Sequence, residues 1–224
     1  MKMKISLCCG VVTFALLAFP MAVAADSGWA VVGKAGTVGI GADVHRAIVP
    51  RTLNLRVGAS FFRYSLDFTN ESIHYGGNLK LGAVPAVLDV YPFRNWFRLG
   101  GGLFVNLNRI EGAARPNQQG QITINGHAYP IAQIGQLDGS VRFNRVAPYF
   151  GLGFGNPIKR SKHWGFWVDL GAMYHGHADA TLTTTIAGIP QLQTDLKQQE
   201  VRFENDARKY TLFPIVQFGV SYRF

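Results

Sequence analysis

The C-terminal segment carries apolar residues at every second position without interruption. Its apolar face consists of Tyr210, Leu212, Pro214, Val216, Phe218, Val220, Tyr222 and Phe224. Its other face includes Gln217, Gly219, Ser221 and Arg223. Lipid gives the backbone no hydrogen-bond partners, so a sheet that spans a membrane must close on itself and turn alternate side chains toward hydrocarbon. Aromatic residues near both ends of the apolar face are typical of such a strand.

The same period-two pattern recurs in six earlier segments, at residues 32–44, 53–66, 79–90, 97–107, 146–154 and 164–174. A tilted transmembrane strand needs about 9 to 11 residues, which these segments provide. After the N-terminal segment, no apolar run approaches the roughly 18 residues of a membrane-spanning helix. The sequence therefore predicts an all-β fold, a closed antiparallel transmembrane β-barrel, rather than a soluble periplasmic β-protein.

Segment 32–44 is interpreted as one strand. Its outward residues would be Val32, Val38, Ile40, Ala42 and Val44, and its inward residues Gly33, Gly39, Gly41, Asp43 and His45. Lys34 interrupts the outward face, which is tolerable if its ammonium group reaches the membrane interface.

Segments 53–66 and 79–90 switch face partway, because their apolar residues change parity after Phe61 and after Ala83. A β-bulge would re-aim the side chains in this way. Alternatively, each strand leaves the bilayer, where both faces are free. The pattern fits both explanations.

The connections indicate how the barrel is oriented. Those at 47–52, 92–96 and 156–163 are predicted to be short periplasmic turns, and those at 70–72, 111–144 and 187–209 to be extracellular loops, the last with a short helix within 192–207. Seven segments are one too few or too many, since bacterial single-chain barrels have an even strand count. The missing strand is sought in 121–143, which contains an Asn125-Gly126 hairpin signal. Eight strands are expected, with ten as the alternative.

The N-terminus has the pattern of a secretory signal. Lys2 and Lys4 precede an apolar stretch at 5–18, and Ala22-Val23-Ala24 is a small-x-small cleavage site. The predicted domains are therefore a cleaved signal at 1–24 and the barrel at 25–224. Both cysteines lie in the predicted signal, which excludes disulfides, a thiolate nucleophile and a cysteine-bound metal from the remainder.

The formal net charge of +9 comes without a basic run or a basic helix. A nucleic-acid partner is therefore not expected. Outer-membrane lipid and anionic lipopolysaccharide are the partners that this surplus favours.

Several segments resemble small, mostly uncharacterised proteobacterial outer-membrane barrels of the broad OmpA/OmpW-like class. They are 87–93 (VLDVYPF), 97–103 (FRLGGGL), 147–153 (APYFGLG) and 165–171 (GFWVDLG). The terminal Ser221-Tyr222-Arg223-Phe224 resembles the C-terminal signal by which such proteins are recognised for barrel assembly, with Tyr222 and Phe224 as its aromatic residues. The resemblance implies a porin-like barrel in the outer membrane of a Gram-negative envelope and contact with the barrel-assembly machinery. It implies no activity.

A set of charged residues is predicted to face the lumen: Asp43, Arg56, Lys80, Asp89, Arg98, Asp169 and Arg223. They would line a conduction or binding path, or form a paired network that fills the interior. About eight strands leave space for side chains or one small ligand, and buried charges must be paired. We therefore expect the filled lumen, in which inward glycines admit Arg and Tyr side chains from across the barrel.

Two other kinds of site are weighed and not expected. His175, His177 and Asp179 would share one strand face and suggest a metal, but no distant third ligand stands out, so no metal or cofactor is predicted. A lipid-modifying enzyme would need a hydroxyl and a base. The candidates are Ser60, Ser65, Ser72, Ser140, His74 and His175, without a G-x-S-x-G motif. The expected function is a structural or interaction role in the envelope. A narrow route for small solutes is the first alternative, and a lipid-modifying enzyme is the second.

Overall fold

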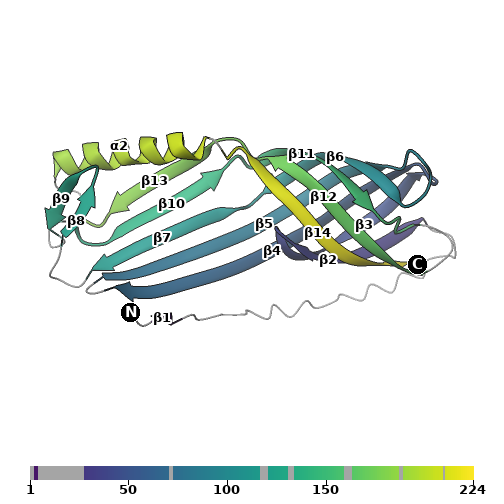
Figure 1. Cartoon of the computed structure of the whole chain (residues 1–224), viewed down its shortest axis with the longest axis horizontal. Helices are drawn as coiled ribbons and strands as arrows, with labels where there is room; N and C mark the ends of the chain where they lie inside the picture. Colours follow the sequence, from purple (N-terminus) through teal and green to yellow (C-terminus); the bar gives the residue numbers. More distant parts are fainter. Residues whose placement is uncertain are drawn as a thin grey trace.

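The computed structural model describes residues 3–4, 28–70, 73–116, 121–130, 134–158, 163–186, 189–208 and 210–224. Eight strands form a closed antiparallel ring: β2 (Trp29–Gly36), β3 (Gly39–Val49), β4 (Leu53–Asn70), β5 (Ile73–Val90), β6 (Phe97–Asn106), β11 (Val146–Phe154), β12 (Trp164–Tyr174) and β14 (Leu212–Arg223). The β4–β5 and β14–β2 pairings close the ring (Figure 1). The predicted fold class is thus confirmed. The predicted signal lies outside the described residues except for β1 (Met3–Lys4), and remains a prediction.

The strand missing from the sequence analysis lies within 32–44, which forms two strands and not one. The chain reverses at Thr37 and Val38, where Gly36 and Gly39 stand opposite each other and Gly39 has a φ of 99°. Val32 and Lys34 of β2 therefore face the lumen, whereas Ile40 and Val44 of β3 face outward as predicted. The placement of Lys34 at the lipid interface is wrong, and so is the search for the missing strand at 121–143.

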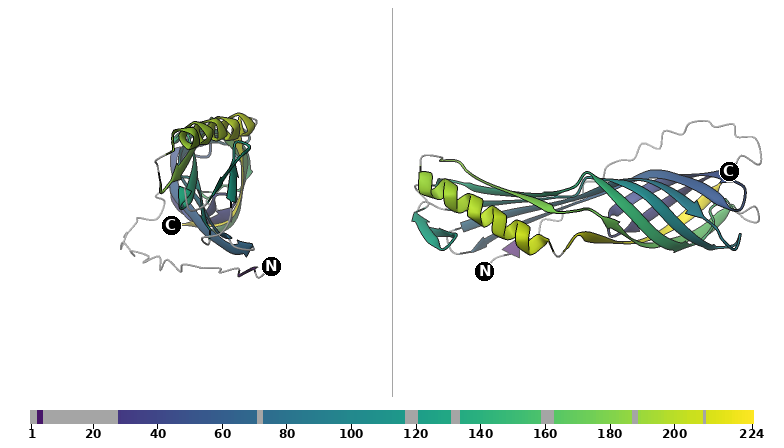
Figure 2. Two further views of the ribbon diagram at one scale, coloured as in Figure 1. Left: turned by 90° about the vertical axis from the view of Figure 1, so that its left-hand side faces the viewer. Right: turned by 90° about the horizontal axis from the view of Figure 1, so that it is seen from above.

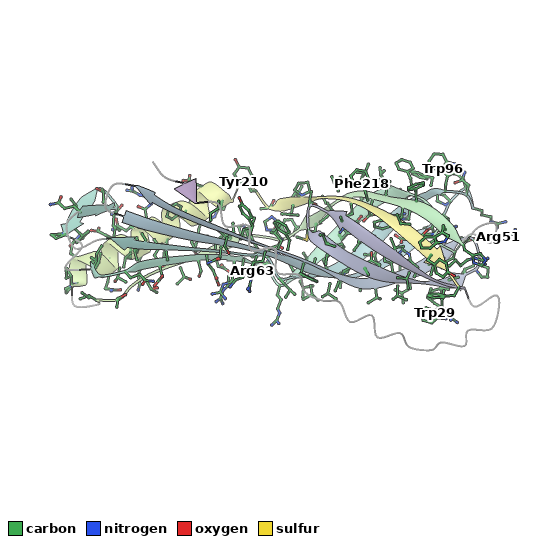
Figure 3. The ribbon with its side chains drawn as sticks, turned by 90° about the horizontal axis from the view of Figure 1, so that it is seen from below. Trp29, Arg51, Arg63, Trp96, Tyr210 and Phe218 are labelled. Atoms are coloured by element: carbon green, nitrogen blue, oxygen red, sulfur yellow. The ribbon has the colours of Figure 1, made fainter. Side chains whose placement is uncertain are left out.

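The outside of the barrel is an apolar belt. Its most exposed members include Phe150 and Phe166, which are 68% and 86% exposed. On β14, Phe218, Val220 and Tyr222 are exposed and Gln217 and Ser221 are buried, and Phe224 directly after the strand is exposed, which confirms the alternation that the sequence predicts. Figure 3 shows Trp29 and Trp96 near one end of the barrel and Tyr210 near the other. No helix in the described part of the chain is long and apolar enough to cross a membrane.

Beyond the barrel, β4 and β5 continue into a sheet with three further strands, here called the extension; the two-residue strand β1 pairs with the other side of β4. Its strand order is β4-β5-β7-β10-β13, with β7 (Arg109–Pro116), β10 (Leu137–Phe143) and β13 (Ala178–Thr184). Figures 1 and 2 show the extension at the end of the barrel opposite the C-terminus. Strands β3, β5 and β11 end, and β4, β6 and β12 begin, at the C-terminal end of the barrel, which is the periplasmic end by the predicted orientation.

The extension explains why two segments switch face. Val57 pairs with Ala86 and Phe62 pairs with Leu81, so the β4–β5 register is the same on both sides of the switch and no bulge intervenes. The pairing of β4 with β3 ends at Phe61, and that of β5 with β6 ends at Ala83. The apolar residues change face where the strands leave the barrel, as the second explanation requires.

Helix α2 (Pro190–Ala207) covers the outer edge of the extension, and it confirms the predicted helix. The backbone N–H groups of Leu182 and Ala180 on the edge strand β13 donate to Glu200 Oε1 at 2.6 Å and to Glu204 Oε1 at 3.3 Å. Capping an edge in this way protects it from pairing with another chain.

The tip of the extension is a small hairpin held against α2. Strands β8 (Gln121–Ile124) and β9 (His127–Pro130) are joined by Asn125 and Gly126, both with positive φ. The hairpin predicted from Asn125-Gly126 is therefore confirmed, but it is not part of the barrel. Apolar side chains hold the hairpin and helix together: Ile124, Tyr129, Ile134, Leu192 and Leu196.

Asp195 of α2 provides the polar contacts to this hairpin. Its carboxylate accepts hydrogen bonds from the Tyr129 hydroxyl and from Asn125 Nδ2 at 3.1 Å, and His127 Nδ1 lies 2.9 Å away. The Tyr129 bond, followed by the Asn125 bond, holds the pKa of Asp195 below its usual range. The same bond raises the pKa of Tyr129 to about 12.

These shifts predict how docking of the hairpin depends on pH. A depressed carboxyl pKa contributes stability that is present above the usual value, about 3.9, and is lost as the pH falls through the lower folded value. The hydrogen-exchange protection factors of residues 124–129, which are corrected for the intrinsic pH dependence of amide exchange, should therefore be high at pH 7 and fall only in strong acid. Asp195→Asn should have lower protection factors at pH 7, and these should not fall further on acidification. Equal protection of the original chain and the variant at pH 7 would contradict this assignment.

Candidate functional site in the barrel lumen

Six charged side chains from six strands meet inside the barrel and are here called the lumen cluster. They are Lys34 on β2, Asp43 on β3, Arg56 on β4, Asp89 on β5, Arg98 on β6 and Asp169 on β12. Their exposed fraction is at most 4%. Three formal positive charges face three negative ones, so the cluster is neutral as a whole. Inward alternation on each strand brings them together, because antiparallel strands of a barrel present every second side chain to one interior.

Arg56 lies at the centre of the lumen cluster and contacts all three carboxylates. Its Nη1 is 3.0 Å from Asp169 Oδ2 and 3.8 Å from Asp43 Oδ2, and its Nε is 3.3 Å from Asp89 Oδ2. Lys34 Nζ approaches Asp43 Oδ1 to 2.8 Å and completes the pairing of that carboxylate. One guanidinium therefore ties together three strands that are not all neighbours in the ring.

Asp169 is the most heavily bonded carboxylate. Besides Arg56, it accepts a hydrogen bond from Arg98 Nη2 at 2.8 Å and one from the Tyr149 hydroxyl at 2.8 Å. Arg98 also donates to the backbone carbonyls of Val168 at 2.9 Å and Gly155 at 3.2 Å. Charge-assisted bonds of this kind are the strong ones, and here they join β4, β6, β11 and β12.

The cations stack on one tryptophan, and glycines make room for them. The Trp167 ring centre lies 4.4 Å from Arg98 Cζ and 5.1 Å from Arg56 Cζ. A Cβ at Gly153 would collide with the Arg98 guanidinium, and one at Gly151 would collide with the Tyr149 hydroxyl. The inward glycines thus admit Arg and Tyr side chains, in the way that the sequence analysis expects.

An apolar layer, here called the apolar cap, lies between the lumen cluster and the extension. Its buried members come from five barrel strands and the β2–β3 turn: Val38, Ala83, Val87, Phe104, Ala147, Tyr149, Met173 and Ile215, with Phe213 packed against them. Phe104 and Tyr149 have ring centres 4.7 Å apart. The lumen is therefore occupied by a charged layer and then by an apolar one.

The structure brings together five of the seven residues predicted to line the lumen, namely Asp43, Arg56, Asp89, Arg98 and Asp169. The other two lie elsewhere. Lys80 is on the extension, 2.6 Å from Glu111, and Arg223 is near the end of β14. Sequence analysis missed Lys34, although a lysine on a lipid-facing strand is a costly placement that could have pointed to the lumen. The predicted set of charges also did not include three uncharged lumen residues, Tyr149, Trp167 and Gln217, the last of which accepts a bond from Lys34 Nζ at 3.4 Å.

The described residues among those weighed for a metal or a catalytic site do not assemble into one. Strand β12 ends at Tyr174 and Gly176 has a φ of 71°, so His175, His177 and Asp179 do not share one strand face. The His175 ring packs edge-on against Phe143, with ring centres 4.2 Å apart. Ser60 is buried, the Ser65 hydroxyl bonds to Asn78 Oδ1 at 2.7 Å, and Ser140 lines a hollow on the extension. Ser72 and the side chain of His74 lie outside the described residues.

Comparison with known proteins identifies structural neighbours. No family model matches the sequence, and no curated protein matches it. The fold is similar to that of CarO2 of Acinetobacter baumannii, with a TM-score of 0.57 and 22% identity over 88% of this chain and 98% of that chain. CarO of the same organism gives a TM-score of 0.55 and 20% identity over 87% and 97%. A major outer membrane protein of Thermus thermophilus gives a TM-score of 0.41 and 13% identity over 88% and 98%.

The CarO2 and CarO structures share a fold with the chain. A closed antiparallel barrel with an apolar exterior leaves no unpaired backbone to face lipid. This architecture confirms the predicted location in an outer membrane and the porin-like class of fold. It supports an outer-membrane β-barrel, which is the coarser part of the family resemblance.

Proposed function

We propose that the protein is an outer-membrane barrel with a closed lumen, whose role is to hold the extension at the cell surface for contact with the envelope or its surroundings. The observation that carries this proposal is the neutral lumen cluster, six charged side chains that are at most 4% exposed. A water-filled channel would leave charges of this kind hydrated.

The contacts of the lumen cluster oppose opening of the barrel. Arg56 reaches three carboxylates, and Asp169 is shared by two arginines and Tyr149. Moving one member aside would leave another buried charge without its partner, at a cost of several kcal/mol. The apolar cap adds a second barrier, because an ion that crosses it would lose its hydration.

Planar-bilayer conductance of the refolded protein tests this proposal. We expect no discrete current steps from a preparation that shows the heat-dependent gel shift of a folded barrel, with a known open porin reconstituted in parallel as a control. Regular single-channel steps would overturn the closed lumen and favour the alternative, a narrow route for small solutes. Turnover of outer-membrane lipid by the purified protein would overturn the non-enzymatic role.

Two further proposals concern assembly and classification. The C-terminal Tyr222 and Phe224 are exposed on the outer face of the barrel end, which supports their role as a recognition signal for the barrel-assembly machinery. The OmpA/OmpW-like assignment rests on the resemblance of the sequence segments and remains a proposal.

A further inference from the structure

Four cationic residues form a row across the first four strands of the extension. Arg63 on β4 lies opposite Lys80 on β5, Lys80 lies opposite Arg109 on β7, and Arg109 lies opposite Arg142 on β10. Directly opposed residues of antiparallel strands present their side chains on the same face. These four residues, here called the cationic row, therefore lie side by side over about 14 Å, which is three interstrand spacings.

The cationic row lies immediately beyond the apolar belt. Phe61 precedes Arg63 by two residues on β4, which is about 7 Å along a strand, and it points to the same face. Phe61 stands opposite Gly82, and the Leu107 side chain occupies the space over that glycine. Phe61 and Leu107 are 44% and 48% exposed. Figure 3 shows Arg63 near the middle of the molecule, where the barrel meets the extension.

The cationic row keeps a positive surplus after its internal ion pairs are counted. Glu111 binds Lys80 Nζ at 2.6 Å and Arg109 Nε at 2.8 Å, and Asp179 lies opposite Arg142 in the register. Four cations against these two carboxylates leave two positive charges. The side chains of Arg63 and Arg142, at the two ends of the row, are exposed to solvent.

A polar hollow lies next to the cationic row, on the side away from the barrel. It has a volume of about 360 Å³, and its lining includes Arg109, Glu111, Asp138, Ser140, Thr181 and Thr183. Hydroxyl and carboxylate groups of this kind hydrogen-bond to sugar hydroxyls. Going outward from the membrane, the face therefore presents an apolar level, a cationic level and a hydroxyl-rich level.

We propose that this face binds a phosphorylated saccharolipid of the outer leaflet, the chemistry of lipopolysaccharide. Its acyl chains lie against Phe61 and Leu107, its phosphates bind the cationic row, and its sugars occupy the polar hollow. Arginine is suited to phosphate because its planar fork donates two parallel hydrogen bonds. This inference goes beyond the proposed function and does not depend on a closed lumen.

Binding of lipid A by the refolded, detergent-solubilised protein tests the proposal. The test variant is Arg63→Glu with Arg142→Glu. The matched control is Arg51→Glu with Arg94→Glu, which changes the net charge equally at exposed turns of the periplasmic end. The probes are diphosphorylated lipid A, the same lipid without phosphates, and inorganic phosphate, with bound lipid measured by native mass spectrometry. The heat-dependent gel shift shows that each variant is folded.

We expect the test variant to bind diphosphorylated lipid A at least about 10-fold more weakly, as the loss of two charge-assisted contacts implies. The control variant should bind like the original chain, and inorganic phosphate should not displace the lipid. Equal weakening in both variants would overturn the proposal, as would equal binding of the dephosphorylated lipid or full displacement by inorganic phosphate. Bilayer conductance should not differ between the two variants, so this test can fail independently of the closed lumen.

Discussion

Replacing Asp169 by Ala should lower the free energy of unfolding by about 3 to 5 kcal/mol, the cost of removing one partner from a buried charge network. Arg56 Nη1 and Arg98 Nη2 would each lose a bond of 3.0 Å or less, and the Tyr149 hydroxyl would lose its acceptor. The lumen cluster would carry a net positive charge in a space that water does not reach. Thermal unfolding in detergent, followed by the gel shift and by fluorescence of the neighbouring Trp167, measures the effect.

The matched control for this prediction is Asp179→Ala, because Asp179 is exposed on the extension. Its unfolding should change by no more than about 0.5 kcal/mol. Asp169→Asn keeps the shape of the side chain and removes the charge. Its loss of unfolding free energy should lie between those of Asp169→Ala and Asp179→Ala. Melting of Asp169→Ala that is indistinguishable from the original chain would contradict a buried ion network.

Gly153→Ala should be nearly as damaging, although it adds one methyl group. The new Cβ would collide with the Arg98 guanidinium and would stand 2.6 Å from the carbonyl oxygen of Val168. Forcing extra atoms into a filled interior costs about 1 to 3 kcal/mol. Displacing Arg98 would also disturb its bond to Asp169. Thermal unfolding in the same detergent provides the measurement.

Gly101→Ala is the control, because Gly101 faces outward from β6 and has no atom within 4 Å of an added Cβ among the described residues. That variant should unfold at the same temperature or slightly higher, since Gly in a strand interior weakens it. Equal effects of the two substitutions would mean that strand propensity, and not crowding in the lumen, decides the stability.

The sequence predicts the barrel well where the outer face of a strand contains apolar residues alone. The lipid-facing side of strand β14 is apolar at every position, so it could be identified from the residues alone. The prediction failed at residues 36–39 because an apolar residue inside the lumen, Val32, has the same parity as the lipid-facing Ile40. The Thr37-Val38 turn also lacks the Asn-Gly type of hairpin signal, so the pattern ran on through a reversal of the chain.

The lumen cluster could be predicted only in part. Inward parity identifies Asp43, Arg56, Asp89, Arg98 and Asp169, but it does not show which of them meet. Lys80 has the parity of the barrel exterior, and the sequence does not show where β5 leaves the barrel. Lys34 was assigned to the wrong face with the rest of β2. The contacts of Arg56 depend on which strands lie across the lumen, and this comes from the closure of the ring rather than from any one segment.

The closed lumen is tested most directly by the reactivity of thiols placed inside it. Ser60 and Ser221 face the lumen, are 3% and 2% exposed, and differ from Cys by one atom. The predicted barrel region contains no cysteine, because the two in the sequence are Cys8 and Cys9. In the folded barrel, Ser60→Cys and Ser221→Cys should not react with a water-soluble thiol reagent, and both should react fully after heat unfolding. Rapid labelling of both thiols in the folded state would show water throughout the interior and would contradict the account.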